Sequence, residues 1–266
     1  MNKINYFILS YNKPDNISTL EMLRNYNIKD VYIVVGDDDP RIEEYKQLDN
    51  VLVFNKQEVA SRVDSIGSYA NTLKLCTYAR VFVDDYATSH GMRYVCIMFD
   101  DIQSVEIRYI DGDMVRSSRD FDLPKALEYY RELLDYNEHV YMTGPPGSSY
   151  YIGCKPGREK QVCSHYANIL IYDTTKQLCQ YKASVLEDMY IVLSNSVIGH
   201  IGLFPFGLQV NCRPSKVTDD AYKGIDGSEY IQQYAILTGE VSHNASNVVI
   251  PYNRFIPKII SGRYKK

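Results

Sequence analysis

The sequence contains no tryptophan, no Cys-x-x-Cys pair and no apolar run of the roughly 18 residues that a membrane span needs. Cys154 and Cys163 lie nine residues apart with His165 nearby, but a zinc site there would need two further ligands at an unfamiliar spacing. The amino-terminal apolar stretch is too short for a signal peptide and lacks a small-residue cleavage site. We therefore expect a cytoplasmic protein with reduced cysteines and no membrane contact.

An excess of positive charge is also missing. The chain carries 29 Lys and Arg residues against 33 Asp and Glu residues, and its net charge of −4 leaves only local patches for contact with a polyanion. The 45% hydrophobic and 23% charged residues are typical of a globular protein. For the length of 266 residues we expect a single domain over residues 1–266.

The glycine-rich phosphate loops of common nucleotide-binding proteins are absent as well. Neither G-x-G-x-x-G nor G-x-x-x-x-G-K-[ST] occurs, and the loop after the first apolar run carries Asn12, Lys13 and Asp15 without a glycine. A glycine cradle is therefore excluded as the main support of a nucleotide. The remaining way to hold a diphosphate beside carboxylates is a divalent cation, Mg²⁺ or Mn²⁺.

The first part of the chain alternates between apolar runs and helical patterns. Apolar runs at 4–10, 31–35 and 50–56 indicate buried strands, and the segments 19–27 and 41–48 between them indicate helices. This alternation predicts a parallel sheet with right-handed crossovers.

The pattern continues less regularly towards the carboxyl end. Residues 58–92 indicate two helices broken near Gly67, and the Gly-, Pro- and Ser-rich stretch 141–161 indicates an excursion inside one domain, because apolar strands flank it. The tail, 213–266, is polar and ends in basic residues. The other expected elements are strands at 94–99, 105–111 and 169–174 and a helix at 122–137.

Polar side chains follow four of the expected strands, in "SYNKPD", "GDDDP", "FNKQE" and "FDDIQ". Ligands of open α/β sheets bind at the carboxyl ends of the strands, so we expect these segments to meet at one edge. Asp100 and Asp101 follow a strongly apolar strand, and adjacent ionised carboxylates repel each other unless water or a cation neutralises them. Two interpretations fit the pair, a solvated turn and a metal site, and the other strand ends favour the metal site.

A second acidic pair is Glu187 and Asp188 in "SVLEDMYIVL". Acidic residues are favoured in the first turn of a helix by its dipole, and this accounts for the pair without any function. The alternative is a general base beside a hydroxyl acceptor.

Seven short motifs occur along the chain in the order "ILSYNKP", "VVGDDDP", "FNK", "YAR", "FDDI", "LEDMYI" and "IPKII". In this order the chain resembles the nucleotide-sugar-dependent glycosyltransferases of the GT-A fold. More narrowly, it resembles the TET-associated glycosyltransferases, which are found in phages and related to the kinetoplastid base J enzyme. The resemblance is clear over residues 1–200 and weak in the tail.

The resemblance implies an α/β fold with a single GT-A-type domain, in which helices flank a Rossmann-like, mostly parallel twisted sheet and a smaller C-terminal region serves the acceptor. Residues 1–112 would form the nucleotide-sugar-binding half and residues 113–212 the acceptor and catalytic half, followed by a loop-rich basic tail at 213–266. A phage-encoded member would act in the host cytoplasm.

The resemblance also implies roles for individual residues. The first loop would line the nucleotide, Asp37 would face the base or ribose, Lys56 would lie near the nucleotide, and Arg80 would contact the diphosphate or sugar. Members of the family usually carry Asn after this arginine, where this chain has Val81. The residues of the first loop are Ser10, Tyr11, Asn12 and Lys13.

Asp100 and Asp101 would hold the ribose and the metal ion, and Ile102 stands where the family often has a third acid. GT-A enzymes often add a late histidine to the metal, for which His243 and His200 are candidates. Asp188, next to Glu187, would be the catalytic base of an inverting transfer.

The predicted function is therefore metal-dependent, inverting transfer of a sugar from a nucleotide sugar, with uridine as the expected base. The acceptor would be a hydroxyl, which the resemblance identifies as a hydroxymethylated pyrimidine of phage DNA. The basic loop 155–160 and the basic end of the tail would then supply the local positive field. Two alternatives remain: a sugar-1-phosphate nucleotidyltransferase, whose Gly-rich first loop is missing, and a non-catalytic nucleotide- or glycan-binding protein.

Overall fold

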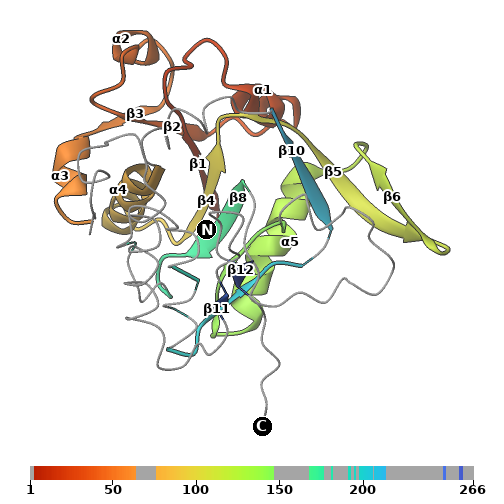
Figure 1. The fold of residues 1–266 in the computed structure, drawn as a ribbon. Helices are drawn as coiled ribbons and strands as arrows, with labels where there is room; N and C mark the ends of the chain where they lie inside the picture. Colours follow the sequence, from red (N-terminus) through yellow and green to blue (C-terminus); the bar gives the residue numbers. More distant parts are fainter. Residues whose placement is uncertain are drawn as a thin grey trace.

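The computed structural model describes residues 3–63, 76–146, 168–176, 181, 191–192, 195, 198–205, 207–213, 248–249 and 258–259. Seven strands form the central sheet in the order β3-β2-β1-β4-β8-β7-β9, and helices cover both of its faces (Figure 1). No helix in the described ranges is long and apolar enough to cross a membrane.

The first half of the sheet is parallel, as the strand and helix alternation predicts. Strands β1, β2, β3 and β4 pair in the order β3-β2-β1-β4, all parallel. The strands are β1 (Ile4–Leu9), β2 (Val31–Gly36), β3 (Val51–Phe54) and β4 (Tyr94–Phe99). The helices are α1 (Ser18–Asn25), α2 (Ile42–Tyr45), α3 (Lys56–Ala60) and α4 (Cys76–Ser89).

The other half of the sheet changes direction. Strand β8 (Ile169–Asp173) runs antiparallel between β4 and β7 (Val140–Thr143), and β9 (Ile201–Leu203) is parallel to β7. The sheet is therefore mainly parallel with one reversed strand, which confirms the predicted fold class. An apolar run such as 169–174 indicates a buried strand, but it carries no information about strand direction.

Two smaller sheets accompany the central one. β5 (Ile102–Asp111) lies between β6 (Met114–Ser118) and β10 (Leu208–Cys212) in an antiparallel three-stranded sheet. β11 (Val248–Val249) pairs with β12 (Lys258–Ile259), and α5 (Leu123–Tyr136) follows the β5–β6 hairpin.

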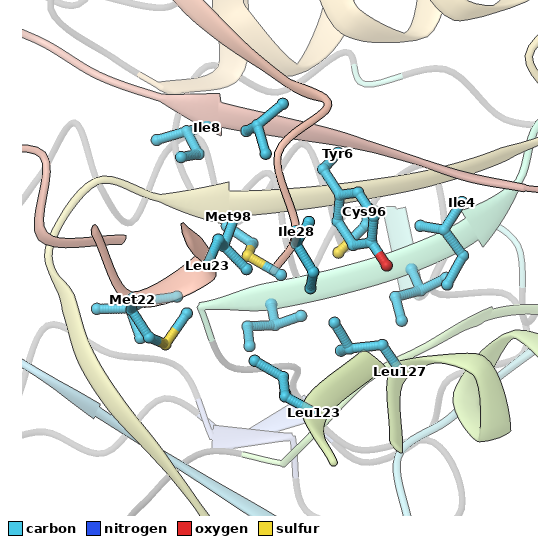
Figure 2. Packing of buried hydrophobic residues seen from close by; sticks show 14 of the residues in the cluster. Ile4, Tyr6, Ile8, Met22, Leu23, Ile28, Cys96, Met98, Leu123 and Leu127 are labelled. Atoms are coloured by element: carbon cyan, nitrogen blue, oxygen red, sulfur yellow. The ribbon is translucent and has the colours of Figure 1, made fainter. Parts of the chain in front are cut away.

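The central strands are largely buried on both faces, which explains why they are mostly apolar. Along β1, Tyr6 and Ile8 point into the core beneath α1 and α5, whereas Phe7 and Leu9 point into the core beneath α4. Figure 2 shows the first of these cores, where side chains of α1 and α5 meet those of β1 and β4.

The turn after β4 is shorter than the sequence predicts. β5 begins at Ile102 and not at residue 105, so Asp100 and Asp101 form a two-residue corner between two strands. Ile102 is fully buried in the core, and its burial draws the start of β5 towards the central sheet. The corner therefore cannot move independently of the core.

Helix α1 holds the backbone of this corner. The Thr19 hydroxyl donates to the carbonyl of Phe99 at 2.5 Å and accepts from the amide of Ile102 at 2.9 Å. The carbonyl of Asp100 accepts from the Thr19 amide at 3.3 Å and from the Ser18 hydroxyl at 3.2 Å. The start of α1 lacks a side-chain cap, so the corner carbonyl satisfies one of its unpaired amides.

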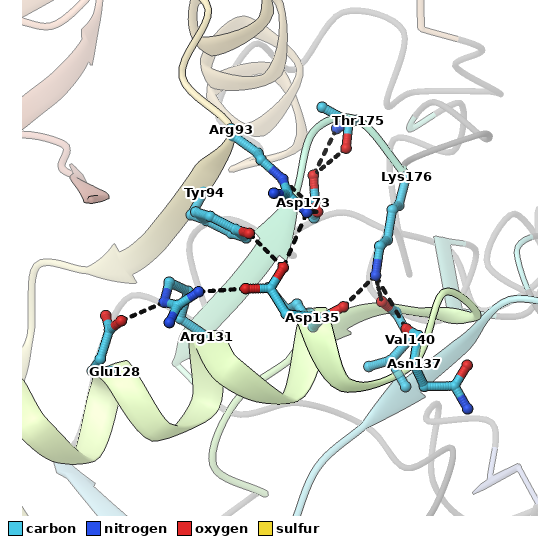
Figure 3. A network of polar contacts seen from close by, with 11 residues as sticks. Arg93, Tyr94, Glu128, Arg131, Asp135, Asn137, Val140, Asp173, Thr175 and Lys176 are labelled. Atoms are coloured by element: carbon cyan, nitrogen blue, oxygen red, sulfur yellow. Dashed lines mark hydrogen bonds and ion pairs between the residues drawn. The ribbon is translucent and has the colours of Figure 1, made fainter. Parts of the chain in front are cut away.

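A network of hydrogen bonds and ion pairs lies at the edge of the sheet opposite the Asp100–Asp101 corner (Figure 3). The fully buried carboxylate of Asp173 accepts two bonds from Arg93, at 3.0 and 2.9 Å, and the Tyr94 hydroxyl donates to Asp135 at 2.6 Å. The Lys176 ammonium donates to three backbone carbonyls at the end of α5 and just beyond it. These contacts lie at the start of β4, away from the corner at its end.

Replacing Thr19 with valine tests the contact between α1 and the corner. The substitution keeps the volume of the side chain but leaves the Ile102 amide and the Phe99 carbonyl without their partner. We expect a loss of about 1–3 kcal/mol in the free energy of unfolding, measured by urea denaturation. The matched control is Thr143→Val, because the Thr143 hydroxyl is fully buried without a hydrogen-bond partner among the described residues. Equal losses in the two variants would contradict the role of Thr19.

Candidate active site

The polar segments that follow β1, β2, β3 and β4 meet at one edge of the central sheet, because these strands are parallel. Hydrogen bonds join the first loop to the residues after β2 and to Asp100 after β4, and others join the residues after β2 to Lys56 after β3. The site is thus assembled from four chain segments.

Asp100 contacts two residues of the first loop. Its carboxylate is buried, accepts from the Ser10 hydroxyl at 2.8 Å and pairs with the Lys13 ammonium at 3.1 Å. Ser10 also contacts the hydroxyl of Tyr45 at 2.7 Å. Of the predicted nucleotide-binding residues, Ser10 and Lys13 therefore both contact Asp100 directly.

Asp101 has an incompletely satisfied carboxylate. Its Oδ1 is buried and has no hydrogen-bond partner in the described parts of the chain. Burial, and then the neighbouring Asp100 carboxylate, raise the pKa of Asp101. The Cys212 thiol lies beside it on β10, where burial and the charge of Asp101 raise the thiol pKa to about 12. The environment of Asp101 thus disfavours a negative charge that lacks a partner.

These properties fit a divalent cation. Carboxylate oxygens are the ligands that Mg²⁺ and Mn²⁺ prefer, and a dication removes both the repulsion between the two aspartates and the deficit at Asp101 Oδ1. Within the described ranges no three His, Cys, Asp or Glu side chains gather around one point. Ile102, at the position of the family's third acid, faces the core.

The three aspartates after β2 have three different environments. Asp39 is buried and accepts from the backbone amides of Asn12, at 2.7 Å, and Arg41, at 2.8 Å. Asn12 has a positive φ of 55°, which asparagine tolerates better than most residues. Asp37 is exposed, and one of its oxygens accepts from the amide of Lys56 at 3.1 Å. Asp39 thus fixes the first loop, and Asp37 keeps a free face towards solvent.

Lys56 is a buried cation that requires a partner. Only 5% of it is exposed, and its ammonium donates to Asp38 at 2.8 Å and lies 5.3 Å from the ring centre of Tyr11. A β-carbon at Gly36 would approach Asp38 Oδ1 to 2.7 Å and Lys56 Cε to 3.1 Å, so the pair needs glycine there. Burial, followed by the nearby aspartates, raises the pKa of Tyr11, which remains partly exposed.

Arg80 lies behind the corner, in α4. It is 2% exposed, and its guanidinium carbon lies 5.3 Å from the ring centre of Phe99, the residue before Asp100. Arg80 thus packs against the end of β4 from within the core. Its contact with a diphosphate or sugar stays a prediction.

Other predicted residues lie elsewhere. Glu187, Asp188 and His243 fall outside the described residues, as does the basic loop 155–160. His200 immediately precedes β9, whose start lies beside the start of β7, at the edge opposite the corner. Of the two candidate histidines, His200 is therefore too remote to share a metal ion with the corner.

Two contacts at the site have no clear signal in the sequence. Tyr45 belongs to "RIEEYKQL", where its spacing from Ile42 indicates only a core-facing position. Arg213 follows β10, and its amide donates to the Asp101 carbonyl at 2.9 Å while its guanidinium donates to Asn16 at 2.9 Å. Both residues reach the site through the tertiary fold, so local patterns do not reveal them.

Solved structures share this fold at low sequence identity. Glucosyl-3-phosphoglycerate synthase from Mycobacterium tuberculosis, in complex with Mg²⁺ and UDP, aligns with a TM-score of 0.50 and 9% identity over 93% of this chain and 82% of its own. The mannosyltransferase PcManGT from Pyrobaculum calidifontis, in complex with GDP-Man and Mn²⁺, aligns with a TM-score of 0.50 and 8% identity over 90% and 68%. The fold is therefore that of nucleotide-sugar glycosyltransferases, the predicted GT-A fold.

A search of curated protein sequences finds no match. The sequence model of one family, described as TET-associated glycosyltransferase, matches residues 4–202. This range contains the first loop, the aspartates after β2, the corner and the "LEDM" segment. The match covers most of the chain, and it confirms the resemblance seen in the order of the motifs. The chain belongs to the TET-associated glycosyltransferase family and is a glycosyltransferase.

Proposed function

We propose that this glycosyltransferase moves a sugar from a uridine-linked nucleotide sugar to the hydroxyl of a hydroxymethylated pyrimidine in DNA, with Mg²⁺ or Mn²⁺ at Asp100 and Asp101. The observation that carries the proposal is the acidic corner, where two adjacent carboxylates lie at the ends of four parallel strands. One of them has a buried oxygen without a hydrogen-bond partner among the described residues. Ligands of open α/β sheets bind at such an edge.

The residues around the corner have distinct roles in donor binding. Asp100 and Asp101 hold the ribose and the metal ion, and His243 is the proposed additional ligand. The bound ion offsets the charge that develops on the diphosphate leaving group. Lys13 already places its ammonium 3.1 Å from Asp100, so it can bind a diphosphate oxygen at the same point. A basic side chain there also favours the anionic leaving group.

The base and ribose would occupy the space near the first loop. Asp37 offers an exposed carboxylate as a hydrogen-bond acceptor for the base or ribose, and Tyr11 offers a partly exposed ring above the Lys56 ammonium. Ser10 and Asn12 complete the lining of the nucleotide. Arg80 supports the corner from behind and contacts the diphosphate or sugar.

Asp188, adjacent to Glu187, is the proposed general base. Its carboxylate takes the proton from the acceptor hydroxyl while the acceptor oxygen forms a bond to the anomeric carbon. The bond from that carbon to the diphosphate oxygen breaks on the opposite side, and UDP leaves. A single displacement of this kind inverts the configuration of the sugar.

The DNA acceptor rests on the family and on local charge. The net charge of −4 offers no general attraction for DNA, so the contact must be local. Arg213 lies directly beside the corner, and the loop 155–160 and the tail carry further basic residues. These residues would contact the phosphates next to the modified base.

Removing either carboxylate of the corner tests the metal site. In assays with Mn²⁺ and a panel of nucleotide sugars, we expect release of UDP from one donor and its loss on chelation. Asp100→Asn and Asp101→Asn should each lower this release by about 100-fold or more, because a metal ligand is lost. The control is Asp113→Asn in the exposed β5–β6 turn, which should keep full turnover. Unchanged turnover in both corner variants would refute the metal assignment.

The role of Asp188 is tested separately from donor binding. Asp188→Asn should lower kcat by about 10²- to 10⁴-fold, with little change in the KM for the donor, because only proton transfer is affected. Glu187→Gln serves as the comparison at the adjacent position. Steady-state kinetics with the preferred donor measure both constants. A larger loss in Glu187→Gln would move the base to the neighbouring residue.

The acceptor is tested with DNA duplexes that contain 5-hydroxymethylcytosine, 5-hydroxymethyluracil or no modification. We expect sugar transfer only to a hydroxymethylated duplex, which mass spectrometry of the DNA detects. The rate of transfer should fall as the salt concentration rises. Release of pyrophosphate from a nucleoside triphosphate and a sugar phosphate would instead identify a nucleotidyltransferase. Nucleotide binding without any turnover would identify a binding protein.

A further inference from the structure

Tyr45 connects the acidic corner to the first loop. The residue ends the four-residue helix α2, its side chain is fully buried, and it lies outside the motifs shared with the family. Its hydroxyl accepts from the backbone amide of Lys13 at 2.9 Å and contacts the Ser10 hydroxyl at 2.7 Å. Ser10 in turn donates to Asp100 at 2.8 Å.

The direction of each hydrogen bond in this chain is determined by its ends. The Lys13 amide can only donate, so the Tyr45 oxygen accepts from it. An ionised Asp100 carboxylate can only accept, so the single proton of the Ser10 hydroxyl points to Asp100. The remaining bond therefore uses the Tyr45 proton, which points to the Ser10 oxygen. The order of donation runs from Lys13 through Tyr45 and Ser10 to Asp100.

This order gives the Tyr45 hydroxyl two functions at once. It immobilises the backbone of the first loop at Lys13, the residue whose ammonium pairs with Asp100. It also holds the Ser10 hydroxyl in the rotamer that donates to Asp100 Oδ2, which leaves the carboxylate one orientation. A phenylalanine would fill the same space in the core, but it would fix neither group.

We propose that Tyr45 is a positioning residue of the donor site, which acts through Ser10 and the Lys13 amide to preorganise Asp100 for the metal–diphosphate complex. The inference rests on the proposed function, because it assumes that Asp100 receives that complex. Preorganisation lowers the cost of ordering the loop and the carboxylate on binding, so the effect of Tyr45 falls on affinity for the donor.

The test compares Tyr45→Phe with Tyr94→Phe. Tyr94 is the matched control because it is also fully buried and its hydroxyl also has a hydrogen-bond acceptor, Asp135, but at the opposite edge of the sheet (Figure 3). Titration calorimetry with UDP and Mn²⁺ should show about three- to tenfold weaker binding for Tyr45→Phe, because neither the Lys13 amide nor the Ser10 hydroxyl is held any longer, and no change for Tyr94→Phe. The thermal unfolding curves of both variants identify a temperature at which each is folded, and the calorimetry is done at that temperature.

A double-mutant cycle distinguishes positioning from a general loss of structure. If Tyr45 acts through Ser10, the double variant Tyr45→Phe with Ser10→Ala loses clearly less affinity than the sum of the two single losses. Additive losses, or equal losses in Tyr45→Phe and Tyr94→Phe, would overturn the inference. Failure of the unsubstituted protein to bind UDP with Mn²⁺ would overturn the proposed function instead, so the two failures are distinguishable.

Discussion

The repulsion between Asp100 and Asp101 is the constraint to which the surrounding structure responds. Two carboxylates at a tight corner repel each other, and the burial of Asp100 increases the free-energy cost of ionising both. Lys13 and Ser10 compensate Asp100 through side-chain contacts, and α1 holds the corner backbone through Thr19. Among the described residues Asp101 Oδ1 has no hydrogen-bond partner, so the charge of Asp101 is compensated less than that of Asp100. A buried polar atom without a partner among the described residues needs an explanation, and a bound cation would provide one.

A single segment, from Gly36 to Tyr45, fixes the backbone of the first loop through side-chain hydrogen bonds. It binds the loop backbone at two successive residues, through Asp39 at Asn12 and through Tyr45 at Lys13. The same segment carries Asp37 and Asp38, which engage the start of α3. The loop lacks the glycines of the common phosphate-binding loops, and its shape therefore depends on these side chains. Side-chain support replaces the backbone cradle.

The parallel half of the fold was predictable because its inner strands are buried on both faces and are therefore mostly apolar, as in β1 and β4. The meeting of the polar strand ends was predictable for the same reason, since parallel strands end at one edge. The reversal of β8, the early start of β5 at Ile102 and the contact of Tyr45 with Ser10 depend on pairing between distant segments. Local sequence does not encode such pairings. It also does not decide which of the two histidines could join a metal ion at the corner, whereas the strand pairing places His200 at the opposite edge of the sheet.

The hydrogen bond from the first turn of α1 to the Asp100 carbonyl has an electrostatic consequence. The amino end of a helix carries about half an elementary positive charge, and here it faces an acidic corner. This fixed partial charge weakens the field that the two carboxylates project towards a cation. A dication at the corner would therefore be held less tightly than by two isolated carboxylates.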